Sequence, residues 1–341
     1  MKLVHSWATR SGLAVIVSAT LFFSACSKAQ TPVAPTPPPP APPPVANAPT
    51  LTCVEGVSRA TVNATGMPVS FEAPSVKDGE GSVNVSCTPA SGENFPIGST
   101  SVTCTATDSL NRTGTCSFSI TVSRIPTIQR VKYLAFGDST TQGEVSPASG
   151  LISFPAVFTK NAVVPSAAWP TVLQQTMRGR YSSQSATIAV SNYGLAGEKA
   201  INSRTRFQSA LRIDRPEVVM ILHGHNDIPT GEDGAASGAA FEIEQMVVEA
   251  RQSGARVYLG TVLPRRPSGN RAISQIYLDD FNSRMRIVAS RQGVTLVDTY
   301  AALNMDVNRY IGVDGLHPTE AGYTKIADTF FQAIQAALEV R

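Results

Sequence analysis

The chain is poor in charge and in long apolar runs. Charged residues make up 16% of its 341 residues, and the formal net charge is +3. Two of the positive charges, Lys2 and Arg10, lie in an N-terminal leader without acidic residues, so the remainder carries +3 − 2 = +1. A nearly neutral chain gives no electrostatic argument for binding nucleic acid, so we expect no nucleic-acid partner.

Cysteine is also scarce, and it is absent from the C-terminal two-thirds of the chain. The five cysteines are Cys26, Cys53, Cys87, Cys104 and Cys116. If Cys26 does not take part in a disulfide, four cysteines remain, and this even number is suited to two disulfides in an oxidising compartment. Disulfides are therefore expected to link one region only.

The apolar run of the leader, from Ser11 to Phe23, is too short to span a bilayer as a helix. It follows a basic start and leads into Phe23-Ser24-Ala25-Cys26, which resembles the lipobox of bacterial lipoproteins. The resemblance implies a signal peptide over residues 1–25, a lipid on Cys26 and, because Ser27 follows, retention at the outer membrane. The alternative is simple secretion with cleavage after Ala29. The lipid anchor is then the only expected contact with a membrane.

Residues 26–49 form a proline-rich linker. Dense proline cannot pack a core and favours extended polyproline II, a semi-rigid spacer of ~3.1 Å per residue.

Residues 50–123 read as a small β domain. Val, Thr and Ser alternate between turn clusters such as 77–81, and no helical stripe appears. Cys87 and Cys104 flank a run with a Gly/Pro turn, so we expect them to pair across adjacent strands, leaving Cys53 and Cys116 to join the ends. Four cysteines allow three connectivities, so this pairing is a preference.

The run from Phe95 to Asp108, followed by Cys116-Ser117-Phe118, resembles the hyalin repeat (HYR) module. The resemblance implies an immunoglobulin-like β-sandwich of a family associated with adhesion. Such a domain either binds a surface ligand or acts as a spacer. The spacer is favoured, because no aromatic cluster marks a binding face.

The pattern changes after residue 129, and residues 129–341 read as an α/β domain in which short apolar strands alternate with helical stretches. This alternation predicts a parallel sheet covered on both faces, with its functional site at the carboxyl ends of the strands. The expected strands are 131–136, 186–190, 218–222, 256–260 and 294–297. The clearest helices are expected at 171–178, 241–252, 277–290 and 319–338.

Four short motifs lie at or after strand ends and together supply the groups needed for acyl transfer by a serine hydrolase. They are Gly137-Asp138-Ser139, Asn192-Tyr193-Gly194, Gly224-His225-Asn226-Asp227 and Asp314-Gly315-Leu316-His317-Pro318. Ser139 is the candidate nucleophile, His317 the base and Asp314 the group that orients it. The N–H groups of Ser139 and Gly194 and the side-chain amide of Asn226 are candidate oxyanion donors.

The spacing of His223 and His225 on one strand also fits a metal site. Zinc needs three or four ligands, and no third histidine or cysteine lies nearby in the sequence, so we expect no metal. His223 is expected to pack at the end of the sheet, and His225 to make a hydrogen bond or line the pocket.

Block by block, these motifs resemble those of the SGNH, or GDSL-type, hydrolases. The resemblance implies a three-layer α/β/α sandwich with a five-stranded parallel, flavodoxin-like sheet, a Ser139-His317-Asp314 triad and no cofactor. Asp227 is implied to be a structural support. Thr140 departs from the usual Leu or Ile, but every catalytic position matches. The implied partner is a small-molecule, glycan or lipid ester, although the fold leaves the substrate open.

Two further segments bear on the site. Residues 144–168 form a long loop rich in Pro, Val and Phe, which fits a lid or an acyl-binding wall. Arg265 and Arg266 follow the fourth strand; we expect both to be exposed to solvent, with the pocket mouth as the alternative. The rival to an esterase is an adhesion or carbohydrate-binding lipoprotein whose hydrolase-like domain is secondary.

Overall fold

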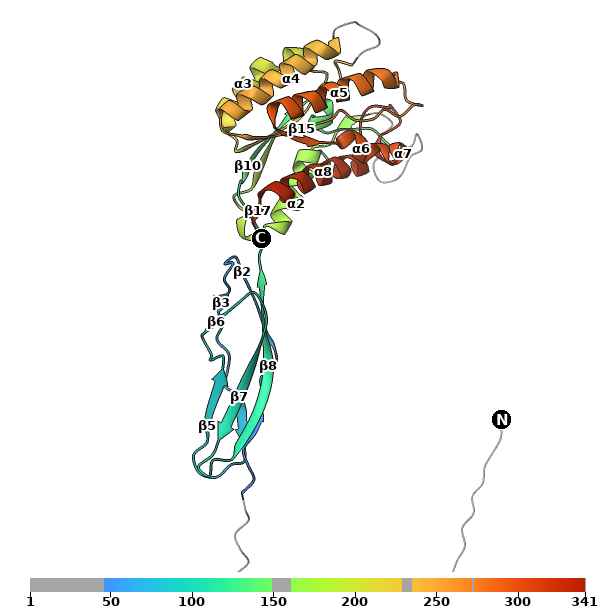
Figure 1. Ribbon diagram of the computed structural model, residues 1–341. Coiled ribbons are helices and arrows are strands. Elements are labelled where there is room, and N and C mark those ends of the chain that lie inside the picture. The colour runs from blue at the N-terminus through green and yellow to red at the C-terminus, as the bar shows by residue number, and fades with distance from the viewer. Residues whose placement is uncertain (1–45, 149–160, 229–234, 272, 341) are drawn as a thin grey trace, which may run out of the picture. The chain divides into compact units, whose positions relative to one another are not determined.

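The structure is a computed structural model that describes residues 46–148, 161–228, 235–271 and 273–340 (Figure 1). The expected signal peptide, Cys26 and most of the proline-rich linker lie outside these residues. Among the described residues, no helix has the length and apolarity needed to cross a membrane. The N-terminal and C-terminal regions are described separately below.

The C-terminal region is built on a five-stranded, fully parallel sheet in the order β13-β10-β14-β15-β16. Its strands are β10 (Lys132–Gly137), β13 (Ala189–Gly194), β14 (Val218–Leu222), β15 (Arg256–Gly260) and β16 (Thr295–Val297). Numbered along the chain, this is the order 2-1-3-4-5 of flavodoxin-like folds. At the carboxyl edge, Gly137 pairs with Gly194 on one side and Leu222 on the other.

Helices cover both faces of this sheet (Figure 1). Successive side chains of a strand point to opposite faces, so the apolar residues of each strand need cover on both. Tyr133 and Ala135 of β10 pack against α2 (Trp169–Arg180) and α8 (Glu320–Leu338). Leu134 and Phe136 point to the other face and pack against the remaining long helices. These are α3 (Arg204–Asp214), α4 (Ala235–Gln252) and α5 (Gln275–Gln292). The three-layer α/β/α sandwich expected from the sequence is confirmed.

Short elements complete this region. They are β9 (Thr127–Ile128), α1 (Ser139–Gln142), β11 (Glu144–Val145), β12 (Ala162–Val163), η1 (Ser182–Gln184), η2 (Ala200–Asn202), α6 (Thr299–Asn304), α7 (Val307–Tyr310) and β17 (Glu339–Val340). β9 pairs with β17, and Ile128 is buried in the core under α2 and α8. The first two residues of this region are thereby tied to its last two.

The second strand lies further along the chain than expected, at Ala189–Gly194 rather than 186–190. The chain first makes the η1 turn, in which the N–H groups of Thr187 and Ile188 donate to the Gln184 carbonyl. Pairing with β10 begins only at Ala189, opposite Lys132. The shift matters because it brings Gly194 to the end of the strand.

The N-terminal region is a β-sandwich with one four-stranded sheet in the order β2-β8-β7-β5 and two small two-stranded sheets, β1-β4 and β3-β6. The strands of the larger sheet are β2 (Val57–Thr61), β5 (Asn84–Thr88), β7 (Gly98–Thr107) and β8 (Thr113–Arg124). The smaller sheets use β1 (Thr50–Thr52), β3 (Met67–Pro68), β4 (Ser75–Lys77) and β6 (Asn94–Phe95). The β-sandwich agrees with the sequence expectation.

Two disulfides link this sandwich. Cys87 of β5 lies directly opposite Cys104 of β7, and the two are bonded. Cys116 of β8 is bonded to Cys53, which follows the first strand. This is the preferred pairing of the three that the four cysteines allow.

The core of the sandwich is small. Its aromatic residues are Phe71, Phe95 and Phe118, which meet edge to face, with Phe71 5.0 Å from Phe118 and 6.4 Å from Phe95 between ring centroids. The sequence from 47 to 124 contains no other aromatic residue. All three rings are thus used in packing.

Candidate active site

The nucleophile candidate sits in a tight turn between β10 and α1. Asp138 caps α1: its Oδ1 accepts from the Thr140 N–H at 3.0 Å and from the Thr140 hydroxyl at 2.8 Å. Gly137 is required by space, because a Cβ there would lie 2.0 Å from the Leu222 carbonyl oxygen. Ser139 is consequently held as the first residue of α1, where an amide has no partner within the helix.

Ser139, His317 and Asp314 form a continuous chain of hydrogen bonds. The Ser139 Oγ lies 2.8 Å from His317 Nε2, and His317 Nδ1 lies 2.6 Å from Asp314 Oδ2. Burial acts to raise the pKa of Asp314, but hydrogen bonds from His317, the Leu316 N–H and Asn161 outweigh it, so this pKa is held well below its usual range. An ionised Asp314 keeps the proton of the neutral imidazole on Nδ1 and leaves Nε2 free to accept one from Ser139.

The turn that carries Asp314 and His317 is fixed by its own backbone bonds. Asp314 Oδ1 accepts from the N–H groups of Leu316 and His317 at 3.0 and 2.9 Å. Gly315 adopts a φ of 86°, which favours glycine, and packs against the backbone of Gly269. The three-residue spacing read from the sequence therefore does bring the two side chains together.

The candidate oxyanion donors come from three elements at the same edge of the sheet. Ser139 begins α1, Gly194 ends β13, and Asn226 follows β14. Because β13 and β14 flank β10, the donors lie on both sides of the Ser139 turn. The Asn226 amide donates one hydrogen to the Glu198 carbonyl at 2.9 Å, which leaves its second hydrogen for another acceptor.

Gly194 differs in one respect from the expected open donor. Its N–H already donates to the Asn192 side-chain oxygen at 2.9 Å, so an oxyanion would share or replace that bond. A Cβ at this position would lie 2.0 Å from the Gln142 amide nitrogen. Glycine is thus required first by the close approach of α1, rather than by access for a substrate.

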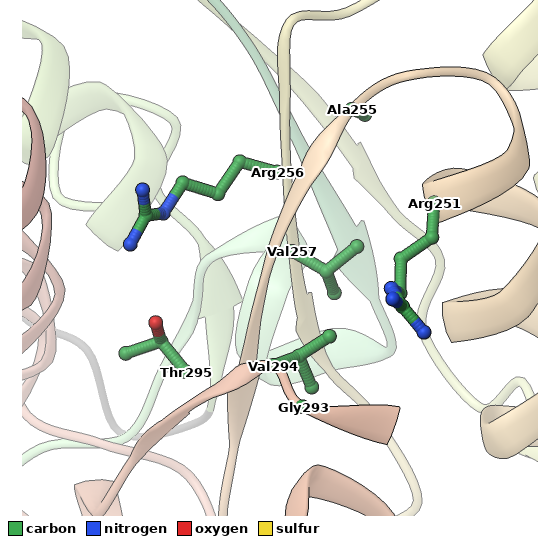
Figure 2. Close-up of a pocket in the computed structure, with 7 residues that line it drawn as sticks. All are labelled: Arg251, Ala255, Arg256, Val257, Gly293, Val294 and Thr295. Carbon is green, nitrogen blue, oxygen red and sulfur yellow. The ribbon is translucent and has the colours of Figure 1, made fainter.

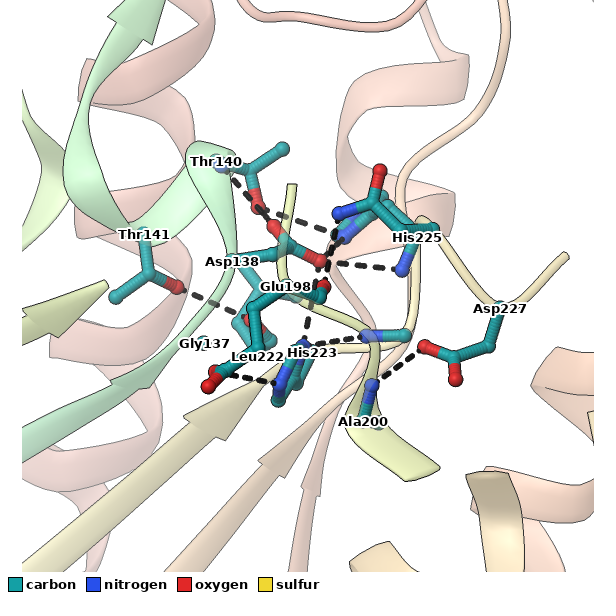
Figure 3. A network of polar contacts seen from close by, with 12 residues as sticks. Gly137, Asp138, Thr140, Thr141, Glu198, Ala200, Leu222, His223, His225 and Asp227 are labelled. Atoms are coloured by element: carbon teal, nitrogen blue, oxygen red, sulfur yellow. Dashed lines mark hydrogen bonds and ion pairs between the residues drawn. The ribbon is translucent and has the colours of Figure 1, made fainter. Parts of the chain in front are cut away.

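A buried polar network lies under the Ser139 turn (Figure 3). The Asp138 Oδ2 contacts His225 Nδ1 at 2.9 Å and His223 Nδ1 at 3.4 Å, and all three side chains are buried. Burial acts to raise the pKa of Asp138, but the two imidazoles lower it well below its usual range. The two histidines expected to share a face therefore do so, as partners of one carboxylate.

His223 and His225 lie in different electrostatic environments. His225 Nε2 accepts from the Leu263 N–H at 3.1 Å, and burial lowers the pKa of His225, so the neutral Nδ1–H form fits every contact. Burial also opposes charge on His223, but Asp138 and Glu198 offset it and raise the pKa of His223. Asp227 supports the neighbouring loop by accepting from the N–H groups of Ala200 and Ile201 at 2.6 and 3.2 Å.

Comparison with known proteins gives the family. Residues 135–325 match the model of the GDSL-like Lipase/Acylhydrolase family, and residues 46–122 match the HYR domain. The chain belongs to the GDSL-like lipase/acylhydrolase family. The protein is therefore an ester hydrolase, and a HYR domain precedes its hydrolase domain. A comparison with curated proteins found no match.

Solved structures similar to this GDSL hydrolase cover the C-terminal region. The lipase/acylhydrolase from Enterococcus faecalis is 20% identical, with a TM-score of 0.49, over 61% of this chain and 97% of that chain. LAE5, an alpha/beta hydrolase enzyme from the metagenome of Lake Arreo, Spain, is 22% identical, with a TM-score of 0.48, over 61% and 96%. Axe2, an acetylxylan esterase from Geobacillus stearothermophilus, is 20% identical, with a TM-score of 0.47, over 61% and 95%.

Arg265 corrects a prediction about the GDSL hydrolase. It was expected to be exposed, but it is buried and donates to the His225 carbonyl at 2.9 Å. Burial lowers the pKa of Arg265 to about 10, while Asp138 and Asp314 oppose this shift. Arg266 is half-buried and donates to the Ala148 carbonyl at 2.9 Å. No pattern in the sequence indicates this burial, because the fold of the 264–271 turn decides which arginine faces inward.

Two residues beside His317 were not expected as site residues. Glu144 Oε2 lies 3.3 Å from His317 Nε2, and Asn161 Nδ2 lies 2.8 Å from Asp314 Oδ2 and 3.0 Å from Glu144 Oε1. The pairing of β11 with β12 brings them together. Within the segment expected to be a lid or acyl wall, 144–168, residues 149–160 lie outside the described residues.

Two pockets differ in chemistry. One, of about 640 Å³, opens beside Asp314 and is lined by Glu144, Pro147, Asn161, Ser268, Asn270, Arg271, Val313 and Asp314. The other, of about 170 Å³, lies at the amino ends of β15 and β16, and its lining includes Arg251 and Arg256, which lie on either side of Val257 in Figure 2. Only the first adjoins the Ser139-His317-Asp314 chain.

Proposed function

We propose that this protein hydrolyses esters with Ser139 as the nucleophile, His317 as the general base and Asp314 as the residue that orients His317. The observation that carries the proposal is the unbroken hydrogen-bond chain from Ser139 Oγ through both imidazole nitrogens to Asp314, with distances of 2.8 and 2.6 Å. Nucleophile, base and orienting group are linked in the order that acyl transfer needs.

The reaction proceeds in two halves. Ser139 Oγ attacks the carbonyl carbon while its proton passes to His317 Nε2, and Asp314 stabilises the imidazolium. The oxyanion that forms is held by the N–H groups of Ser139 and Gly194 and the Asn226 amide. His317 Nε2 then gives its proton to the leaving alcohol. Water next attacks the acyl carbon while the same nitrogen takes its proton; the bond from this carbon to Ser139 Oγ breaks, Oγ receives the proton from His317, and the acid is released.

The test is Ser139→Ala, assayed on p-nitrophenyl esters of increasing acyl length and on acetylated sugars. We expect kcat to fall by at least about 10⁴-fold, to the residual rate that binding and the oxyanion donors sustain. Labelling by a fluorophosphonate should be lost in the same variant. A folded variant that keeps more than a tenth of the activity would overturn the assignment.

We further propose that the protein acts outside the cytoplasm, anchored to the outer membrane by a lipid on Cys26, with the HYR domain as a spacer. The two disulfides suit an oxidising compartment. The three phenylalanines of the HYR domain are packed together, which removes them as platforms for stacking sugars. Metabolic labelling with palmitate should depend on Cys26. Unlabelled protein in the medium would support plain secretion instead.

A further inference from the structure

The polar pocket adjoins the triad at two residues: Asp314, which contacts His317 Nδ1, and Glu144, which lies 3.3 Å from His317 Nε2. In serine hydrolysis the base gives its proton to the leaving oxygen, so the alcohol lies beside His317 Nε2 rather than beside the oxyanion donors. The pocket of about 640 Å³ is lined there by Asp314, Asn161 and Glu144. If Ser139 acts as proposed above, this pocket receives the alcohol.

The lining of the pocket is suited to a polar alcohol. Glu144, Asn161, Ser268, Asn270 and Arg271 all present polar groups to it. Among the described lining residues, Pro147 and Val313 alone are apolar. Such a surface offers little to a long alkyl chain and many partners to hydroxyl groups.

Glu144 is the group best placed to form a hydrogen bond with the leaving alcohol close to the bond that breaks. Its Oε2 lies 3.3 Å from His317 Nε2, the atom that protonates the leaving oxygen. In the leaving alcohol, one carbon bears the ester oxygen. A hydroxyl on the carbon adjacent to it therefore comes within reach of the Glu144 carboxylate. Among the described residues, no lysine or arginine forms an ion pair with Glu144.

Asn161 holds the Glu144 carboxylate in place. Its amide nitrogen has two hydrogens, and Glu144 Oε1 at 3.0 Å and Asp314 Oδ2 at 2.8 Å accept them. Its third contact, to His317 Nδ1 at 3.0 Å, is then no donation, because that nitrogen carries the hydrogen given to Asp314. The Oε2 of Glu144 is left directed to His317 Nε2 and to the alcohol.

We propose that Glu144 is a specificity-determining residue that accepts a hydrogen bond from a free hydroxyl adjacent to the ester on the leaving alcohol. The preferred substrates are then partly acylated vicinal diols and polyols, rather than simple alkyl esters. The Glu144 side chain is half-buried, with 20% of its surface exposed. A site built to accept a substrate hydroxyl discriminates against an analogue that lacks it, because this partly desolvated acceptor then loses its partner.

The experiment compares 2-hydroxyethyl and 2-methoxyethyl esters, as acetates and as butanoates, with the full chain. The two alcohols differ only in whether the neighbouring oxygen can donate. A hydrogen bond to a carboxylate contributes about 1.5–3 kcal/mol, so we expect kcat/KM to favour the hydroxyethyl ester by about tenfold or more. Glu144→Met should remove this preference. Glu242→Gln, on α4 where Glu242 lies 3.7 Å from Arg204, should keep it.

The outcomes separate this proposal from the proposed function. Equal hydrolysis of both esters by the wild type, dependent on Ser139, would overturn the role of Glu144 and leave the nucleophile in place; this comparison needs no variant to fold. An equal loss of rate on both esters in Glu144→Met would also overturn it, because Glu144 would then act only on the imidazolium. Hydrolysis unchanged in Ser139→Ala would overturn the proposed function itself.

Discussion

The HYR domain is held together by two disulfides around one small apolar core, whereas the hydrolase domain has no cysteine and buries a core on each face of its sheet. The difference follows from size. A domain of fewer than 80 residues buries a smaller fraction of its surface than one of about 200, so cross-links supply what packing cannot.

The two domains also differ in where their polar residues lie. In the hydrolase domain, buried carboxylates and histidines gather at one edge of the sheet, around Asp138 and Asp314. The HYR domain contains no histidine. Its buried acid, Asp108, accepts from the N–H groups of Leu110 and Arg112 at 3.0 and 2.9 Å and so fixes a turn. Buried polar side chains thus fix a turn in the HYR domain, whereas in the hydrolase domain they gather around the candidate active site.

The largest expected effect is that of reductant on the HYR domain. In the chain-entropy model a disulfide closing a 15-residue loop contributes about 3 kcal/mol and one closing 100 residues about 4.7, so the two together approach the whole stability of a small domain. Calorimetry of a soluble chain of residues 46–341 should show two transitions, and dithiothreitol should remove only that of the HYR domain. The value of kcat/KM on small esters should not change.

Removing the HYR domain tests the same comparison by deletion. A chain of residues 127–341 should fold and keep its activity, because it retains β9 and the buried Ile128. A chain that starts at 130 should be less stable, since it loses the β9–β17 pair. A folded but inactive 127–341 chain would show that the HYR domain contributes to the site.

Asn226→Ala should act on chemistry rather than on stability. Loss of one oxyanion donor usually lowers kcat by about 10²–10³-fold, with little change in KM. The lost bond to the Glu198 carbonyl should cost only about 1 kcal/mol of stability. Asn308→Ala, an exposed change on α7, is the control. A rise in KM with constant kcat would instead make Asn226 a ground-state binding residue.

The pH dependence should separate activity from stability. Asp314 has a pKa held well below its usual range, so on the acid limb of kcat/KM it stays ionised in mildly acidic solution and continues to orient His317. On this limb kcat/KM should fall as the solution is acidified, because a protonated base cannot accept the proton of Ser139. A second ionisation in this limb, or inhibition by EDTA relieved by zinc, would contradict the triad without metal.

Stability should fail only at lower pH. The depressed pKa values of Asp138 and Asp314 give stability that is present above the ordinary value of about 3.9 and is lost as the pH falls through the folded-state values. Activity lost in mildly acidic solution should therefore return on neutralisation. The calorimetric transition of the HYR domain should stay constant over the same range.

Much of the hydrolase fold was predictable because parallel strands buried on both faces are nearly continuous apolar runs. Val218–Leu222 is wholly buried and was predicted at those residues. The strand Ala189–Gly194 was placed too early, since only partial burial marks it and the η1 turn sets its start. α3, whose apolar face is narrow, was not among the helices named.

The site was predictable where motif spacing brings groups together locally, as in the turn from Asp314 to His317. The site was not predictable where its contacts depend on segments that are distant in the sequence. Glu144 reaches His317 only because β11 pairs with β12, and Arg265 turns inward only because its loop packs on Gly315. Neither contact leaves a periodic signal in the sequence, because each is set by the path of a loop.

The smallest expected effect is also the finest test of the two cores. Ile120 in the HYR domain and Ile326 on α8 are both fully buried, so Ile→Val at either site should cost about 0.5–1.5 kcal/mol. One kcal/mol shifts Tm by about 4–8 °C in a domain of 60–100 residues but by about 2–4 °C in one of 150–250. Calorimetry of each variant should therefore show a shift about twice as large for Ile120→Val, confined to the HYR transition. Equal shifts, or a shift of both transitions by one substitution, would show that the two domains unfold as a single unit.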